Sequence, residues 1–182
     1  MELLKCSVMQ KRKIIYLRRW GQKSIFIFGI SIYQFLFNRS FWLDESYLGL
    51  NIIDKGYLAL LKPLDYEQVA PILFLEISKF FGSLFGYTEY SLRFFPLLCF
   101  WGSMFFFYKI LSSLLKSRFL IIIVLVLFTL NVTILSYSSE FKQYMTDVLV
   151  VTCIFYLSIT EFSDNKTKFF WLGTVGAISI FL

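Results

Sequence analysis

Two adjacent acidic residues, Asp44 and Glu45, follow an apolar run that ends with Trp42 and Leu43. A carboxylate that emerges at a membrane surface is partly desolvated, and its pKa can then rise toward the value that suits a general base. Asp44 is therefore a candidate base. The alternative is that both acids are solvated residues at the end of a membrane span, and the dipeptide alone favours that alternative.

A second group of polar residues lies in the segment SSEFKQYMTD. If one helix covers this segment, Glu140, Tyr144 and Asp147 share a face at positions i, i+4 and i+7. Asp147 would then lie about one turn inside an apolar run, where a charge is costly and usually faces a cavity or a partner. Lys142 and Arg93 supply cations on the same side. The alternative is a structural ion pair of Asp147 with one of these two cations.

Other kinds of site are excluded or weakly indicated. The chain has no His, so imidazole catalysis, a His-ligated zinc and a His pH switch are excluded. Its cysteines lie far apart and are interpreted as packing thiols. No metal ligand set is predicted, and no cofactor is certain. Asp44 and Glu45 could bind a divalent cation, but two adjacent acids are weak evidence for such a site.

Composition indicates the kind of fold that must position these residues. The chain has 182 residues, of which 58% are hydrophobic and 16% are charged. A soluble domain is closer to half apolar and a quarter charged. These values argue against a soluble enzyme and a disordered chain. They predict an all-α integral membrane protein, a multispan helical bundle.

The spans are predicted from the apolar runs and the basic clusters. Residues 1–23 carry seven of the eighteen basic residues and are predicted to be a cytoplasmic N-terminus. Residues 24–43 are predicted to be the first transmembrane helix, because twenty helical residues cover roughly 30 Å. Further spans are expected at 94–115, 119–137, 145–160 and 169–182. The last is too short to cross, so we expect the chain to be truncated in its fifth span, as an N-terminal fragment, a truncated reading frame or a pseudogene product.

The outer loop, residues 44–93, is predicted to contain interfacial helices. Its segment 71–86 is apolar but short, and it carries Glu76 and Lys79 on one helical face. That pattern favours a helix lying in the membrane interface over one that crosses. A non-crossing segment also keeps most basic residues inside and most acids outside. We therefore predict a multi-pass protein of the plasma membrane, in contact with lipids and not with nucleic acid.

Three segments together resemble a known family. They are FWLDE, LLKPLDYEQVAPILFLEISKFFGSLFGYTEYSLRFFPLL and SYSSEFKQYMTD, within residues 41–150. Their order and motifs resemble the N-terminal part of bacterial membrane glycosyltransferases of the GT-C type, which are related to protein mannosyltransferases and aminoarabinose transferases. The motifs are Asp-Glu after the first span, Gln68-x-x-Pro71, Gly86-x-x-Glu89-x-x-x-Arg93 and Glu140-x-x-x-Tyr144.

The resemblance implies a large multispan fold with its active site at the outer face. It implies transfer of a sugar from a polyprenyl-phosphate donor to a lipid, glycan or protein acceptor, without a nucleotide. Asp44 would be the catalytic base, and Glu45 would position the substrate or hold the base. Donor-phosphate and substrate binding would fall to Arg93, Lys142, Glu140, Tyr144 and Gln68. Members of this family are longer, so we expect this chain alone to be inactive.

A non-enzymatic function is the alternative. A small multispan protein could serve as half of a transporter, as a flippase or as an assembly partner. In that case Asp147, Glu140 and Lys142 would form structural pairs or an ion path. The effect of single substitutions at Asp44 and at Asp147 distinguishes the two classes.

Overall fold

The computed structural model describes residues 29–37, 39–162 and 164–182. Within these residues the chain is helical and contains no strand, which confirms the predicted all-α class. The basic segment 1–23 and the first residues of the predicted span 24–43 lie outside the described residues.

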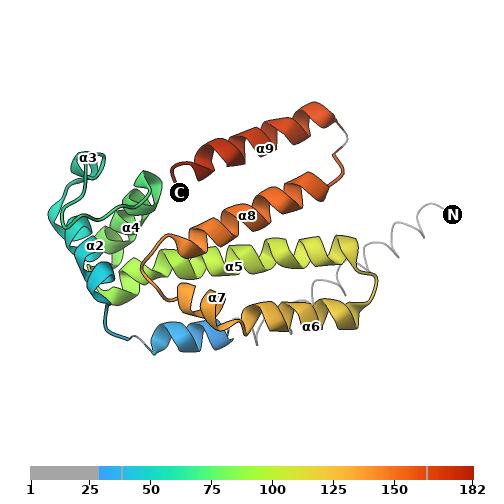
Figure 1. The fold of residues 1–182 in the computed structure, drawn as a ribbon, viewed down its shortest axis with the longest axis horizontal. Coiled ribbons are helices and arrows are strands. Elements are labelled where there is room, and N and C mark those ends of the chain that lie inside the picture. The colour runs from blue at the N-terminus through green and yellow to red at the C-terminus, as the bar shows by residue number, and fades with distance from the viewer. Residues whose placement is uncertain (1–28, 38, 163) are drawn as a thin grey trace.

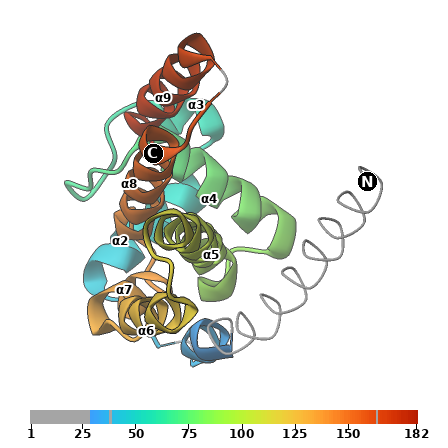
Figure 2. The ribbon, with the colours of Figure 1, turned by 90° about the vertical axis from the view of Figure 1, so that its right-hand side faces the viewer.

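One long helix organises the rest of the bundle. The helical elements are residues 29–36, α2 (Leu43–Asp54), α3 (Tyr57–Leu60), α4 (Ile72–Phe85), α5 (Glu89–Leu114), α6 (Arg118–Thr129), α7 (Val132–Tyr137), α8 (Tyr144–Ile159) and α9 (Asn165–Ser179). Helix α5 runs through the centre, with α6 and α8 beside it and α9 beyond α8 (Figure 1). Helices α2, α3 and α4 gather at the N-terminal end of α5 (Figure 1). In the end-on view, α8 and α9 lie on one side of α5 and α6 lies on the other (Figure 2).

Helix α5 is the one helix in the described part of the chain that is long and apolar enough to cross a membrane. Its 26 residues would extend about 39 Å. The apolar helices α6 and α8 are shorter. One helix of this kind is weak evidence for membrane association. The predicted helical fold is thus confirmed, with one helix of membrane length. The structure does not show that the protein spans the membrane several times.

Two predicted spans are interrupted. The predicted span 119–137 is divided into α6 and α7, because the Asn131 side chain accepts hydrogen bonds from the backbone of Thr133 and Ile134 at 3.0 and 3.2 Å. This is the usual way in which Asn starts a new helix. Within the predicted span 24–43, the described helix ends at residue 36, and residues 39–42 are not helical. The prediction of a continuous helix was wrong in both places.

The remaining predicted helices are present with shifted ends. Segment 145–160 forms α8, segment 169–182 overlaps α9, and segment 71–86 forms α4. The orientation of α4 differs from the prediction, because Lys79 does not face the surroundings. It is 7% exposed, and its ammonium donates to the Ile52 carbonyl at the end of α2 at 2.7 Å. The exposed face of α4 is apolar instead and includes Phe80, Leu84 and Phe85.

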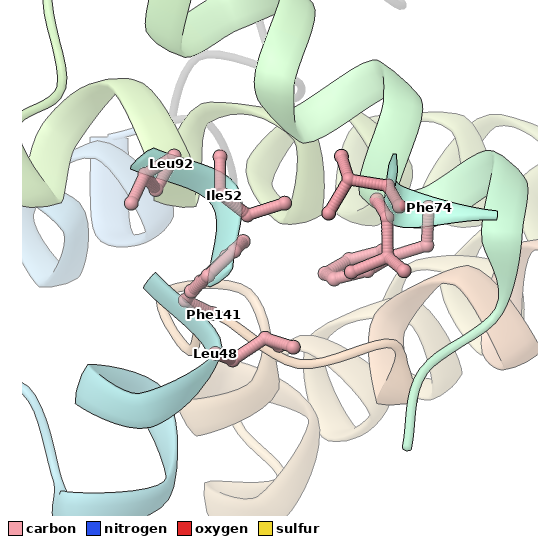
Figure 3. Close-up of a cluster of buried hydrophobic side chains, with 7 residues drawn as sticks. Leu48, Ile52, Phe74, Leu92 and Phe141 are labelled. Atoms are coloured by element: carbon pink, nitrogen blue, oxygen red, sulfur yellow. The ribbon is translucent and has the colours of Figure 1, made fainter. Parts of the chain in front are cut away.

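A buried hydrophobic cluster joins the elements at this end of the bundle. Leu48 and Ile52 come from α2, Phe74 from α4, Leu92 from α5 and Phe141 from the α7–α8 connection (Figure 3). Because apolar burial is the main favourable term in folding, this cluster fixes α2 against the start of α8. It therefore helps to set the positions of the polar residues at the start of both helices.

Candidate functional site

A pocket of about 360 Å³ lies between the N-terminus of α2 and the start of α8. Its lining residues come from two distant segments of the chain: Trp42, Leu43, Asp44, Glu45, Glu140, Lys142 and Tyr144. Five of them are residues that the sequence predicted for a site: Asp44, Glu45, Glu140, Lys142 and Tyr144. The structure thus brings the two groups of polar residues together.

Asp44 lies on the wall of the pocket in the first turn of α2. A carboxylate at a helix N-terminus is stabilised by the helix dipole, so its position also has a structural reason. Its side chain is exposed, which differs from the partly desolvated place predicted for it. An exposed carboxylate beside a pocket is accessible to a substrate hydroxyl.

Glu45 has a different environment from its neighbour. It is 1% exposed, and its carboxylate forms an ion pair with Arg93 at 3.0 Å. The same carboxylate accepts hydrogen bonds from the backbone N–H of Trp42 at 3.0 Å and of Phe141 at 2.6 Å. Glu45 therefore joins α2, α5 and the connection before α8. The resemblance implies that Glu45 positions the substrate or holds the base, whereas the contacts seen here hold the elements around the pocket together.

Arg93 does not line the pocket. It is 1% exposed, and besides Glu45 it donates to the Arg39 carbonyl at 2.6 Å and lies over the Phe41 ring at 4.6 Å. A guanidinium that is buried and paired in this way is not accessible to a donor phosphate. The structure therefore does not support the phosphate-binding role expected of Arg93, and gives it a structural position behind the pocket.

A second ion pair involves Glu140, which lines the pocket. Arg39 donates to the Glu140 carboxylate at 3.0 Å and lies 5.5 Å from the centre of the Trp42 ring. Their side chains are 30% and 20% exposed. The sequence reasoning missed Arg39, although a basic residue just before FWLDE is a visible signal.

Glu140 precedes α8, whose N-cap is Gln143, so the predicted stripe of Glu140, Tyr144 and Asp147 on one helix is wrong.

Lys142 is the cation on the pocket wall. Its ammonium donates to the Gln68 side-chain oxygen at 3.1 Å, so Gln68 reaches the site without lining the pocket. Tyr144 is 40% exposed and packs against Tyr137 with ring centres 4.8 Å apart. Lys142 and Tyr144 both lie at the N-terminal end of α8, where backbone N–H groups favour a bound anion.

Asp147 takes neither of the partners considered for it. It is exposed in the first turn of α8 and is absent from the pocket lining. Arg93 pairs with Glu45, and Lys142 contacts Gln68. The structural pair that the sequence suggested for Asp147 is therefore wrong.

The pocket offers little to a metal ion. No group of three or more His, Cys, Asp or Glu residues that could hold a metal occurs in the part of the chain that the structure describes. Asp44 and Glu45 do not present two open carboxylates, because both Glu45 oxygens accept hydrogen bonds from Arg93. An exposed carboxylate, Asp44, and a cation, Lys142, border the pocket. The carboxylate can accept a proton, and the cation can attract an anion.

Searches against protein-family models, curated proteins and solved structures find no match to this chain.

Proposed function

We propose that this pocket is the active site of a membrane glycosyltransferase that uses a polyprenyl-phosphate-linked sugar. The observation that carries the proposal is the gathering of Asp44, Lys142 and Tyr144 around one pocket at the end of an apolar helix bundle. A reaction of this kind needs a base for the acceptor and a fixed cation for the leaving phosphate. The pocket supplies one group of each type.

In the proposed reaction Asp44 accepts the proton of the acceptor hydroxyl. The acceptor oxygen then forms a bond to the anomeric carbon of the sugar. The bond between that carbon and the phosphate oxygen breaks, and its electron pair leaves with the polyprenyl phosphate. Attack from the face opposite the phosphate inverts the anomeric carbon. The exposure of Asp44 supports this role, because an acceptor must reach its carboxylate directly.

Lys142 is assigned to the donor phosphate in this proposal. Negative charge grows on the phosphate as the bond breaks, and a fixed cation stabilises that charge. The N-terminus of α8 adds to this effect, since its backbone N–H groups favour an anion at the same place. Arg93 and Glu45 hold the pocket walls together from behind.

The membrane setting is also part of the proposal. A lipid-linked donor would diffuse laterally to the bundle and leave its tail among apolar helices. Exposed apolar side chains on α4 and α9, among them Phe85 and Phe170, support a lipid environment. We propose a multi-pass protein of the plasma membrane with this pocket at its outer face.

Substitution of Asp44 tests the assignment. In membranes from the organism that encodes the protein, the gene would carry Asp44→Asn, and transfer of a labelled sugar from a polyprenyl-phosphate donor would be measured. We expect transfer to fall by about 10²- to 10⁴-fold while the protein inserts normally. Asp54→Asn is the matched control, because Asp54 is an exposed acid at the other end of α2. Unchanged transfer by Asp44→Asn would contradict the proposal.

A non-enzymatic assembly partner is the second candidate. The observation that favours it is that Glu45 and Glu140 are already paired with Arg93 and Arg39, which is typical of a structural network. In that case Asp44→Asn would have no effect, whereas Arg93→Met would impair function by destabilising the fold.

A further inference from the structure

A side chain of the α3–α4 loop, residues 61–71, contacts a residue that lines the pocket. The Gln68 side-chain oxygen accepts a hydrogen bond from the Lys142 ammonium at 3.1 Å. Gln68 does not line the pocket, whereas Lys142 does. Gln68 therefore contacts the cation that would bind a pocket ligand, and it does not border the pocket itself.

The loop is fixed to α2 just before Gln68. The Asn51 side chain accepts from the Asp65 N–H at 2.8 Å and donates to the Asp65 carbonyl at 3.2 Å. Lys55 forms an ion pair with Asp65 at 3.2 Å. Tyr47 stacks on Tyr66 with ring centres 4.8 Å apart. These contacts tie the loop to the helix that carries Asp44.

The backbone that leads into Gln68 has an uncommon conformation. Tyr66 and Glu67 have φ values of 60° and 55°, in the left-handed region that non-glycine residues rarely adopt. Two such residues in succession persist only where the surrounding contacts hold them. Here those contacts turn the chain so that the next side chain, Gln68, meets Lys142.

The chemistry of the Gln68 amide fits a role in orienting the cation. Its nitrogen lies 3.4 Å from the Tyr66 carbonyl within the same loop, which leaves its oxygen for Lys142. A neutral amide oxygen can orient an ammonium without neutralising its charge, whereas a carboxylate would form an ion pair with it. The Lys142 charge thus stays available to an anion in the pocket.

We propose that Gln68 is a positioning residue that holds the Lys142 ammonium on the pocket wall for a phosphate group. This inference rests on the proposed function, in which Lys142 binds the donor phosphate. It differs from the expectation that Gln68 contacts the substrate itself, because Gln68 acts through Lys142.

The test measures binding of a short-chain polyprenyl phosphate to the protein purified in detergent from membranes of the organism that encodes it. Gln68→Leu removes the hydrogen-bond acceptor, and we expect binding to weaken about tenfold, the scale of one hydrogen bond to a charged group. Gln68→Glu keeps the reach but neutralises the ammonium, so we expect a loss at least as large. Glu67→Gln is the matched control, since Glu67 is the exposed neighbour in the same loop, and it should bind normally.

A double-mutant cycle separates positioning from a general structural role. In a Lys142→Met background, Gln68→Leu should cause no further loss of binding, because there is no ammonium left to hold. Equal losses in both backgrounds, or unchanged binding by Gln68→Leu in the wild-type chain, would overturn the inference. Unchanged binding by Lys142→Met would instead overturn the phosphate site of the proposed function.

Discussion

At the scale of single residues, the neighbours Asp44 and Glu45 have opposite environments. Asp44 is exposed on the pocket wall, whereas Glu45 is buried and paired with Arg93. Adjacent residues on a helix point in directions about 100° apart, so Asp44 is exposed while Glu45, which also borders the pocket, reaches Arg93 on α5. The sequence could predict that an acid stands at this place. It could not predict the pairing with Arg93, which lies 48 residues away along the chain.

The buried pair leads to a prediction about stability. Arg93→Met leaves the Glu45 carboxylate buried without its cation, and we expect a loss of about 3–5 kcal/mol in the free energy of unfolding. Denaturant unfolding of the purified protein, followed by circular dichroism, measures this loss. Lys62→Met is the control, because Lys62 is exposed and surface substitutions usually change stability by at most about 0.5 kcal/mol. Equal losses in the two variants would contradict the prediction.

Glu76 gives a prediction about pH. Burial raises the pKa of the Glu76 carboxyl above 4.5, the effect of burial being larger than the opposing effect of the Lys79 charge. One Glu76 oxygen is buried without a hydrogen-bond partner. A folded-state pKa above the unfolded value contributes stability below the unfolded pKa, and this stability is lost as pH rises through the folded pKa.

We therefore expect Glu76→Gln to stabilise the protein at neutral pH and not at pH 4. Thermal unfolding at a series of pH values, with Glu67→Gln at an exposed site as the control, measures the difference. A stabilisation that is the same at every pH would show that ionisation of Glu76 is not its cause.

At the scale of elements, most helices could be predicted from the apolar runs, and their ends could not. The segments predicted at 94–115 and 145–160 correspond to α5 and α8 with small shifts. The break at Asn131 was missed because the apolar pattern continues across it, while one side chain decides where the helix restarts. Lys79 was placed on the wrong face, because a charge three residues from Glu76 resembles a polar stripe. Its actual partner is the carbonyl at the end of α2.

The contact between α5 and α8 gives a prediction at this scale. A side chain at Gly102 would bring its first carbon within 2.8 Å of a Leu149 methyl group on α8. We expect Gly102→Val to displace the Leu149 side chain from its packing position and to destabilise the protein by about 1–3 kcal/mol. Gly176→Ala in α9 is the control, since nothing lies within 4 Å and Ala favours a helix. Thermal unfolding should show a lower midpoint for the first variant only.

At the scale of the whole molecule, the pocket exists because three chain segments end at the same place. The residues before α2, the N-terminal part of α5 and the α7–α8 connection meet around the cluster of Leu48, Phe74 and Phe141. Motif order along the chain could predict that Asp44 and Lys142 belong together. It could not predict that Arg93 would face inward, since this depends on how α5 rotates against α2.

The connections between helices lie at two opposite ends of the bundle, and their positions predict which loops face each side of the membrane. The pocket and the α7–α8 connection lie at one end, whereas the α5–α6 and α8–α9 connections lie at the other, about 39 Å away along α5 (Figure 1). In a variant whose native cysteines are replaced by alanine, a membrane-impermeant maleimide applied to intact cells should label Asp54→Cys and Tyr144→Cys. It should label Lys116→Cys and Glu161→Cys only after the cells are opened. Basic residues around the α5–α6 connection favour this orientation. Labelling of all four positions in intact cells would contradict a crossing by α5. If Glu161→Cys is labelled in intact cells and Lys116→Cys is not, a crossing by α8 is contradicted.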